Sequence, residues 1–224
     1  LMRSSAASDV YKRQEYICGV TFAPFACAGA FFKPGAKESL AMMKERTGAN
    51  FVIFVPGGLQ ETPQSEEICF TSKATMEDDE LIAMIEYAKE IGLRVALKPT
   101  VNCKNGTWRA HINFFDEDVP CEPKWGNWFA SYTAFQLHYA KIAEQHDCEM
   151  FIAGCEMVMS EHREQEWRKL LSDIRQVYHG LLSYNTDKYQ EHRVNWWDAV
   201  DVISSSGYYP YAVSYTHLTL PTIA

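Results

Sequence analysis

Three kinds of sequence signal are missing from this chain, and each absence disfavours a class of protein. No apolar run approaches the roughly 20 residues that a membrane-spanning helix needs. The glycine patterns GxGxxG and GxxxxGK(S/T), which hold nucleotide phosphates, are absent. A basic excess is lacking as well, because the formal net charge is -8. We therefore expect no membrane and no nucleic-acid partner.

The seven cysteines form no CxxC pair, and no histidine spacing completes a zinc pattern. Their odd number favours reduced, buried thiols over a disulfide framework. This interpretation places the protein in a reducing compartment, the cytoplasm. Secretion stays an alternative, because the sequence does not show a native start.

Aromatic residues are abundant, at 13% of the chain with six Trp and twelve Tyr. Such an excess has two interpretations: large side chains of a core, or ring platforms for a flat ligand such as a sugar. The 224 residues, 47% of them hydrophobic, are enough for one substantial core.

The two ends of the chain have an unusual relation. Residues 4–14, SSAASDVYKRQ, are encoded by a DNA string that resembles a transposase sequencing adapter. The reverse complement of the same string encodes residues 213–222, VSYTHLTLPT. We therefore expect residues 1–14 and 212–224 to be adapter-derived tails. Residues 15–211 are then expected to be the native part, a partial domain without its true start and without a substantial C-terminal portion.

Between these ends, expected strands and helices alternate. Short apolar runs predict strands at residues 16–22, 50–55, 93–100, 150–155, 180–184 and 200–207. Helical spacing predicts helices over residues 36–47, after a Thr75–Asp78 capping box, over 127–146, after a Ser160 cap, and over 187–199. Gly48 and Gly92 are expected to end the first two helices, and residues 101–126 are expected to form a long loop.

This alternation implies a parallel sheet, either an open doubly wound sheet or a barrel. The missing glycine fingerprint argues against the doubly wound nucleotide fold. Six strand–helix units, less the last helix, fit an α/β fold of the (β/α)8 TIM-barrel type that is truncated after about strand six. Such barrels typically have roughly 250 residues or more.

In such a barrel the chemistry lies at the C-terminal ends of the strands. All six expected strands are followed by polar or aromatic residues, although the strands themselves are apolar. This asymmetry indicates a ligand site. Its candidate residues are Thr21, Gln60, Lys98, Thr100, Asn102, Trp108, Arg109, His111, Glu156, Tyr184, Asn185, Asp187, Tyr208 and Tyr209.

Glu156 is the sharpest signal among these residues, because it directly follows the apolar run MFIAGC. Partial desolvation there helps a carboxyl to hold a proton near neutral pH, as a general acid must. The alternative is a structural glutamate that caps the next turn or pairs with Arg109, Lys98 or Arg163.

Lys98 has three interpretations: a Schiff-base amine, a donor to sugar hydroxyls, or a salt bridge to a carboxylate at the barrel mouth. Five rings, those of Trp108, Trp125, Trp128, Tyr208 and Tyr209, are either stacking platforms or packing. His111 and His138 lack the partners of a metal site or a triad, so both are taken as structural. The loop at residues 114–118, FFDED, is acidic, and a solvated loop is favoured over a cation site because the oxygen spacing of a calcium loop is missing.

The resemblance to a known family rests on five segments that stand in a fixed order along residues 16–211: YICGVTFAPF, GANFVIFVP, RVALKPTVNCKNGTWRAHI, EMFIAGCEM and DVISSSGYYP. Together they resemble the family-113 glycoside hydrolases, barrel enzymes of the large retaining clan typified by β-1,4-mannanases. The wider clan usually has Asn just before the acid/base, and here that position is Cys155.

The resemblance implies a proton donor at the end of strand four, which is Glu156 here. The nucleophile would be a glutamate at the end of strand seven, and this chain stops after strand six. Tyr208 or Tyr209 would orient that nucleophile. The resemblance also implies contacts of the sugar cleft at Lys98, Asn102, Trp108, Tyr184 and Asn185.

The expected function is retaining hydrolysis of a β-1,4-linked polysaccharide or oligosaccharide, mannan first and xylan second, with no cofactor or metal. Without its nucleophile the chain is expected to be inactive, and poorly soluble because the edges of its first and last strands are exposed. Two alternatives stay open: a non-catalytic carbohydrate-binding barrel, and a Schiff-base lyase that uses Lys98.

Overall fold

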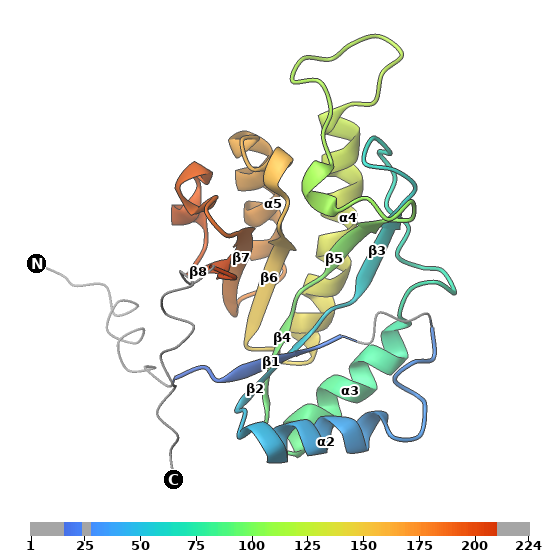
Figure 1. Cartoon of the computed structure of the whole chain (residues 1–224), viewed down its shortest axis with the longest axis vertical. Helices are drawn as coiled ribbons and strands as arrows, with labels where there is room; N and C mark the ends of the chain where they lie inside the picture. Colours follow the sequence, from blue (N-terminus) through green and yellow to red (C-terminus); the bar gives the residue numbers. More distant parts are fainter. Residues whose placement is uncertain (1–15, 24–27, 210–224) are drawn as a thin grey trace, which may run out of the picture.

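Six parallel strands form one sheet in a computed structural model that describes residues 16–23 and 28–209 (Figure 1). The expected adapter-derived tails, residues 1–14 and 212–224, lie outside the described residues. The strands occur in the order β1 (Gly19–Phe22), β2 (Phe51–Phe54), β4 (Arg94–Leu97), β6 (Met150–Cys155), β7 (Leu181–Asp187) and β8 (Val202–Ser206). This spatial order follows the chain order, as in a barrel, whereas a doubly wound sheet reverses its order at a switch point. The predicted (β/α)8-type architecture is therefore confirmed over six strands.

A second, two-stranded parallel sheet extends the C-terminal end of the first one. It pairs β3 (Gly57–Gln60) with β5 (Thr100–Cys103). The sequence predicted neither strand and placed residues 101–126 in a loop, which is wrong for residues 101–103. Pro56 separates β2 from β3, and Pro99 separates β4 from β5. Because proline donates no ladder hydrogen bond, each strand is interrupted there and resumes as a new one.

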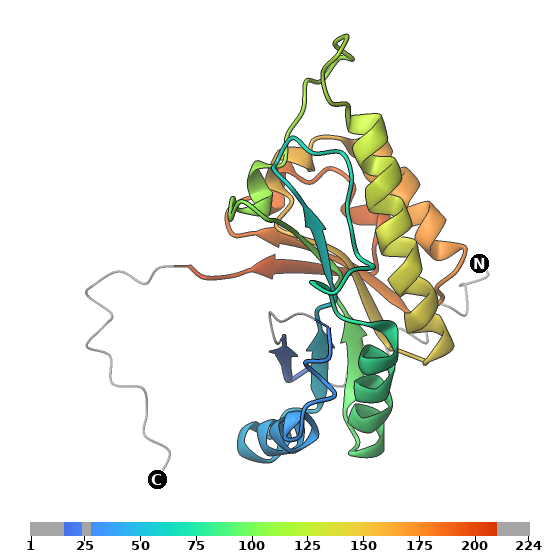
Figure 2. The same ribbon diagram turned by 90° about the vertical axis from the view of Figure 1, so that its right-hand side faces the viewer.

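Within residues 16–23 and 28–209, four α-helices cover the sheet: α2 (Ala36–Thr47), α3 (Asp78–Glu90), α4 (Trp125–Gln145) and α5 (Glu164–Arg175). Figure 2 shows α3, α4 and α5 along one side of the strands. The bounds of α2 and its left-handed Gly48 cap are as predicted. No helix among the described residues is long and apolar enough to cross a bilayer.

Two of the predicted helix starts are wrong. The capping box of α3 is formed by Glu77 and Glu80, since the buried Glu80 carboxylate accepts the Glu77 N–H at 2.8 Å. Helix α5 begins after Arg163, and Ser160 ends the 3-10 turn η2 (Val158–Ser160), where its hydroxyl donates to the Met157 carbonyl at 2.8 Å.

The helix predicted over residues 187–199 is also wrong. Strand β7 runs on to Asp187, and the rest contains two 3-10 turns, η3 (Glu191–Arg193) and η4 (Trp197–Ala199). Trp196 between them is fully buried and stacks on Trp167, with 4.9 Å between the ring centroids. Burying this indole fixes the local chain more strongly than helix propensity does, which is a weak preference.

Alternation along the strands builds two apolar layers. Phe51, Ala96, Met150 and Ile152 pack together on the inner face of the sheet. Their sequence neighbours face the helices and join the larger core cluster; these are Val52, Phe54, Val95, Leu97, Phe151 and Ala153. Burial on both faces explains why these strands are continuous apolar runs rather than alternating ones.

A β-bulge in β6 interrupts this alternation just before Glu156. Ile152 pairs with Ser183 and Cys155 with Asn185, so three steps on β6 oppose two on β7. The extra residue turns Cys155 back toward the inner face, where it lines a cavity. Glu156 then follows with a positive φ of 55°, a sparsely populated conformation for a non-glycine residue.

Gly154→Ala is expected to lower the free energy of unfolding by about 1–3 kcal/mol, because a Cβ at this position overpacks the core. It would lie 2.9 Å from both Tyr132 Oη and Tyr184 Cε2, in a region where both rings are fully buried. Thermal unfolding followed by circular dichroism measures the effect. Gly126→Ala is the matched control, since a Cβ there meets nothing within 4 Å, and its melting temperature should not fall. Equal melting temperatures for the two variants would contradict the packing argument.

Candidate active site

A cavity of about 460 Å³ opens at the C-terminal ends of the strands. Its wall combines polar side chains from several strands with small apolar ones. The lining residues that matter for the chemistry are Thr21, Lys98, Thr100, Asn102, Arg109, Cys155 and Tyr208. The site was predicted at this end of the barrel, and the structure has a cavity there.

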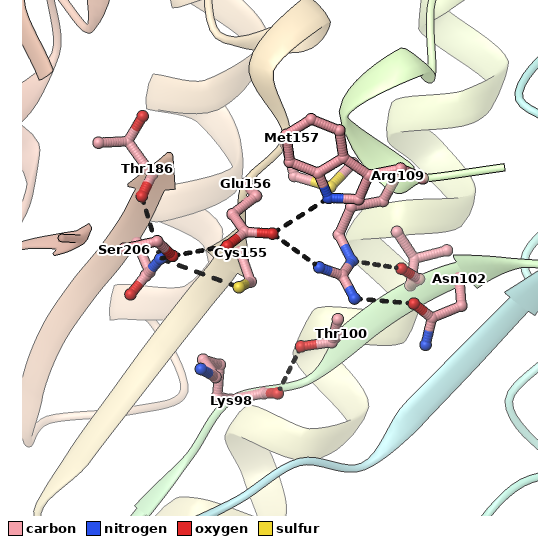
Figure 3. Close-up of polar contacts among 12 residues, drawn as sticks. Lys98, Thr100, Asn102, Arg109, Cys155, Glu156, Met157, Thr186 and Ser206 are labelled. Carbon is pink, nitrogen blue, oxygen red and sulfur yellow. Dashed lines mark hydrogen bonds and ion pairs between the residues drawn. The ribbon is translucent and has the colours of Figure 1, made fainter. Parts of the chain in front are cut away.

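Glu156 lies at the edge of this cavity, between the lining residues Cys155 and Arg109 (Figure 3). Its carboxylate accepts three hydrogen bonds from side chains. Trp108 Nε1 and Arg109 Nη1 each donate to Oε2 at 3.1 Å, and Ser206 Oγ donates to Oε1 at 2.6 Å. The side chain is 17% exposed, so it is largely desolvated and held in one orientation.

Arg109 forms an ion pair with Glu156, with 3.1 Å between Nη1 and Oε2. Its guanidinium also donates to the Val101 carbonyl at 3.0 Å and to Asn102 Oδ1 at 2.8 Å. Strand β5 therefore fixes the arginine, and the arginine fixes the carboxylate by a charge-assisted bond. Of the three pairing partners that the sequence offered for Glu156, the structure has Arg109.

Ser206 and Asn185 support Glu156 from the opposite side. Asn185 Nδ2 donates to Ser206 Oγ at 2.9 Å, and the Asn185 carbonyl accepts the Glu156 N–H at 2.7 Å. Ser206 was missed as a candidate. The run of serines in β8 is its only sequence signal, because it breaks the apolar pattern of the other strands.

Lys98 is half-buried and lines the cavity from the end of β4. Among residues 16–23 and 28–209 it forms no ion pair, so the salt-bridge interpretation finds no partner there. Burial raises the pKa of the neighbouring Cys155 thiol, and the positive charge of Lys98 opposes that shift.

The three tyrosines predicted at the site behave differently. Tyr208 is 78% exposed and lines the cavity, whereas Tyr209 bonds through its hydroxyl to the Glu191 carboxylate. Tyr184 is fully buried on the helix side, where its hydroxyl donates to Glu161. Tyr184 and Asn185 are successive residues of β7, so they point to opposite faces. The structure therefore brings Asn185 to the site and leaves Tyr184 behind it.

Trp125 and Trp128 are core residues, with exposures of 2% and 0%. Trp108 is 43% exposed beside Glu156, so it can still act as a stacking platform.

The histidine and the acidic loop that were taken as structural have partners within the fold. His138 bonds to Asp78 at 2.8 Å. In the acidic loop, Asp116 is paired with His162 at 2.8 Å, which fits the solvated-loop interpretation.

A sequence profile of Glycoside Hydrolase Family 113 matches residues 20–222. The chain belongs to glycoside hydrolase family 113. Glu156 follows β6, the fourth strand of the barrel, and this is the position where the resemblance places the proton donor of the family. The family assignment supports the hydrolase hypothesis over the Schiff-base lyase.

Solved structures of family 113 enzymes are similar to most of this chain. Two solved structures of GH113 β-1,4-mannanase, one of them of a complex, are each 57% identical to this chain with a TM-score of 0.86. The β-mannanase AaManA from Alicyclobacillus acidocaldarius, in complex with ManMIm, is 41% identical with a TM-score of 0.84. Each alignment covers 88% of this chain, and the chain spans 64% and 63% of the two enzymes. No curated protein matches the sequence.

Proposed function

We propose that this family 113 chain carries the acid/base half of a retaining hydrolase that cleaves β-1,4-linked mannan. The observation that supports this most is the Glu156 carboxyl, which is held by three donors at the edge of the cavity. The similar solved structures are β-1,4-mannanases, which makes mannan the first substrate to test and xylan the second.

In a retaining mechanism a second carboxylate, about 5–5.5 Å from the first, attacks the anomeric carbon. Glu156 protonates the leaving oxygen and then deprotonates the hydrolytic water. The nucleophile is proposed on the seventh barrel strand, whereas the described residues supply six. The 224-residue chain is therefore proposed to be inactive by itself, and the whole enzyme to need no cofactor.

The cavity wall would bind the sugar around this carboxyl. Lys98, Asn102 and Tyr208 offer hydrogen-bonding groups to sugar hydroxyls, and the exposed face of Trp108 offers a surface for stacking. Asn185 would act through Ser206 and Glu156. We also propose a cytoplasmic location, supported by six described cysteines that are all free.

The test is to assay the gene product that includes the seventh strand on mannan and xylan oligosaccharides, with the 224-residue chain as the control. Proton NMR of the first product is expected to show the retained β-anomer from mannan and no turnover by the control. An inverted first product would contradict the mechanism. Turnover by the 224-residue chain at the rate of the longer protein would contradict the location of the nucleophile.

A further inference from the structure

Glu161 is a buried carboxyl on the helix side of the sheet, five residues after Glu156. The proposed reaction does not use it directly. It is 2% exposed and directly follows the turn η2. Its Oε1 accepts hydrogen bonds from Tyr184 Oη and Thr186 Oγ1, both at 2.7 Å. Its Oε2 is buried and has no hydrogen-bond partner among the described residues. Buried polar atoms are rarely left in this way, so Glu161 calls for an explanation.

A short chain of hydrogen bonds connects Glu161 to the backbone of Glu156. Tyr184 Oη donates its one proton to Glu161, and it accepts the N–H of Met157 at 3.1 Å. Met157 directly follows Glu156, so this N–H belongs to the peptide that joins the two residues. The other side of Glu156 is held by its own N–H, which donates to the Asn185 carbonyl at 2.7 Å.

We propose that Glu161 is a positioning residue for Glu156: it fixes the Tyr184 hydroxyl so that this oxygen holds the Glu156–Met157 peptide in its strained conformation. The proposal rests on the acid/base function proposed above for Glu156. Glu156 itself has a φ of 55°, which persists only where the surroundings over-determine the backbone. The hydroxyl is aimed correctly because Glu161 accepts its proton and leaves a lone pair for Met157.

The chemical state of Glu161 decides which substitution preserves this chain. Burial raises the pKa of the Glu161 carboxyl, while the hydrogen bonds from Thr186 and Tyr184 oppose that shift. The position needs an acceptor at Oε1 rather than a full negative charge. Glutamine supplies such an acceptor with nearly the same shape, and leucine supplies none.

The kinetic test compares Glu161→Leu, Glu161→Gln and Tyr184→Phe in the gene product that includes the seventh strand. Tyr178→Phe is the matched control, because it also removes a buried tyrosine hydroxyl. That hydroxyl donates to the carbonyl of Cys148, which precedes β6, at 2.7 Å. Each variant is assayed for kcat/KM on a mannooligosaccharide and on a dinitrophenyl mannobioside. The second substrate has a leaving group that needs no proton, so only the first depends on the placement of Glu156 as an acid.

Glu161→Leu and Tyr184→Phe are expected to lower kcat/KM on the oligosaccharide about tenfold or more, with little change on the dinitrophenyl substrate, because small displacements of a catalytic group are costly. Glu161→Gln should stay close to wild type. Tyr178→Phe should lower the melting temperature without changing the ratio of the two rates. Equal losses on both substrates, or the same ratio change in Tyr178→Phe, would overturn the proposal.

A second measurement does not need activity. Amide hydrogen exchange at Met157 in the 224-residue chain is expected to be faster in Glu161→Leu and Tyr184→Phe than in Tyr178→Phe and Glu161→Gln. Indistinguishable exchange in all four variants would overturn the positioning role. If the wild-type enzyme cleaves neither substrate, the proposed function fails, and the exchange rates still decide whether Glu161 holds this peptide.

Discussion

Glu156→Gln is expected to lower the hydrolysis of mannan oligosaccharides by about 10²- to 10⁴-fold, the usual contribution of a positioned general acid/base. Glutamine keeps the shape of the side chain. Its one amide oxygen can accept hydrogen bonds from Trp108 and Arg109 while its NH2 group donates to Ser206 Oγ, but it has no proton to give to the leaving oxygen. The fold should survive, because β6 and its bulge are held by the backbone and by Gly154.

The measurement is kcat/KM of the protein that includes the seventh strand, on oligosaccharide and on a dinitrophenyl mannobioside. Loss should be confined to the oligosaccharide, whose leaving group needs a proton. Glu117→Gln is the matched control, since this residue is exposed on the loop before α4, and its rates should equal those of wild type. Full activity of Glu156→Gln on the oligosaccharide would show that the strand-four assignment is wrong.

Trp167→Ala is expected to lower the free energy of unfolding by about 3–5 kcal/mol, the usual loss for a large aromatic residue in a core. Trp167 is fully buried on α5, and its Nε1 donates to the Ser160 carbonyl at 2.9 Å. Its ring lies 4.9 Å from those of Tyr184 and Trp196, centroid to centroid. Removal leaves a cavity between α5 and the outer face of β6 and β7.

Thermal and urea unfolding, together with the activity of the longer protein, are compared for the two variants Trp167→Ala and Trp108→Ala. The comparison separates an effect on stability from an effect on the site. Trp108 is 43% exposed and bonds to Glu156, so its removal should change the melting temperature little and lower the activity of the longer protein. Trp167→Ala should lower the melting temperature by roughly 6–20 °C for a chain of this size. A larger stability loss in Trp108→Ala than in Trp167→Ala would contradict the assignment of one ring to the site and the other to the core.

The local sequence determined the elements whose pattern is periodic and continuous. Helix α2 and strand β6 have the predicted bounds, and Gly48 ends α2 in the left-handed conformation. Strand runs that are apolar at nearly every position are typical of strands covered on both faces, and the two core layers agree with this. The candidate acid/base also follows from the sequence, because Glu156 directly follows such a run.

The local pattern failed where a contact between distant segments decided the conformation. The stretch after Asp187 has enough helical spacing to predict a helix, but the burial of Trp196 against α5 replaces that helix by turns. Tyr184 and Asn185 were both predicted at the site, and the extension of β7 to Asp187 turns only Asn185 toward it. The length of β7, which depends on pairing with β8, therefore decided that Asn185 and not Tyr184 lies on the side of Glu156.

Only the tertiary structure decided how Glu156 is held. Its three donors come from the loop after β5 and from β8, 47 to 50 residues away along the chain, and no spacing in the sequence connects them. The bulge that turns Cys155 toward the cavity depends on the pairing of β6 with β7, where three steps along β6 lie opposite two along β7. The sequence by itself determined which residue carries the carboxyl and on which strand it stands. The orientation of the Glu156 carboxyl depends on strand pairing and side-chain packing between distant segments. A short stretch of sequence does not contain the residues that make these contacts.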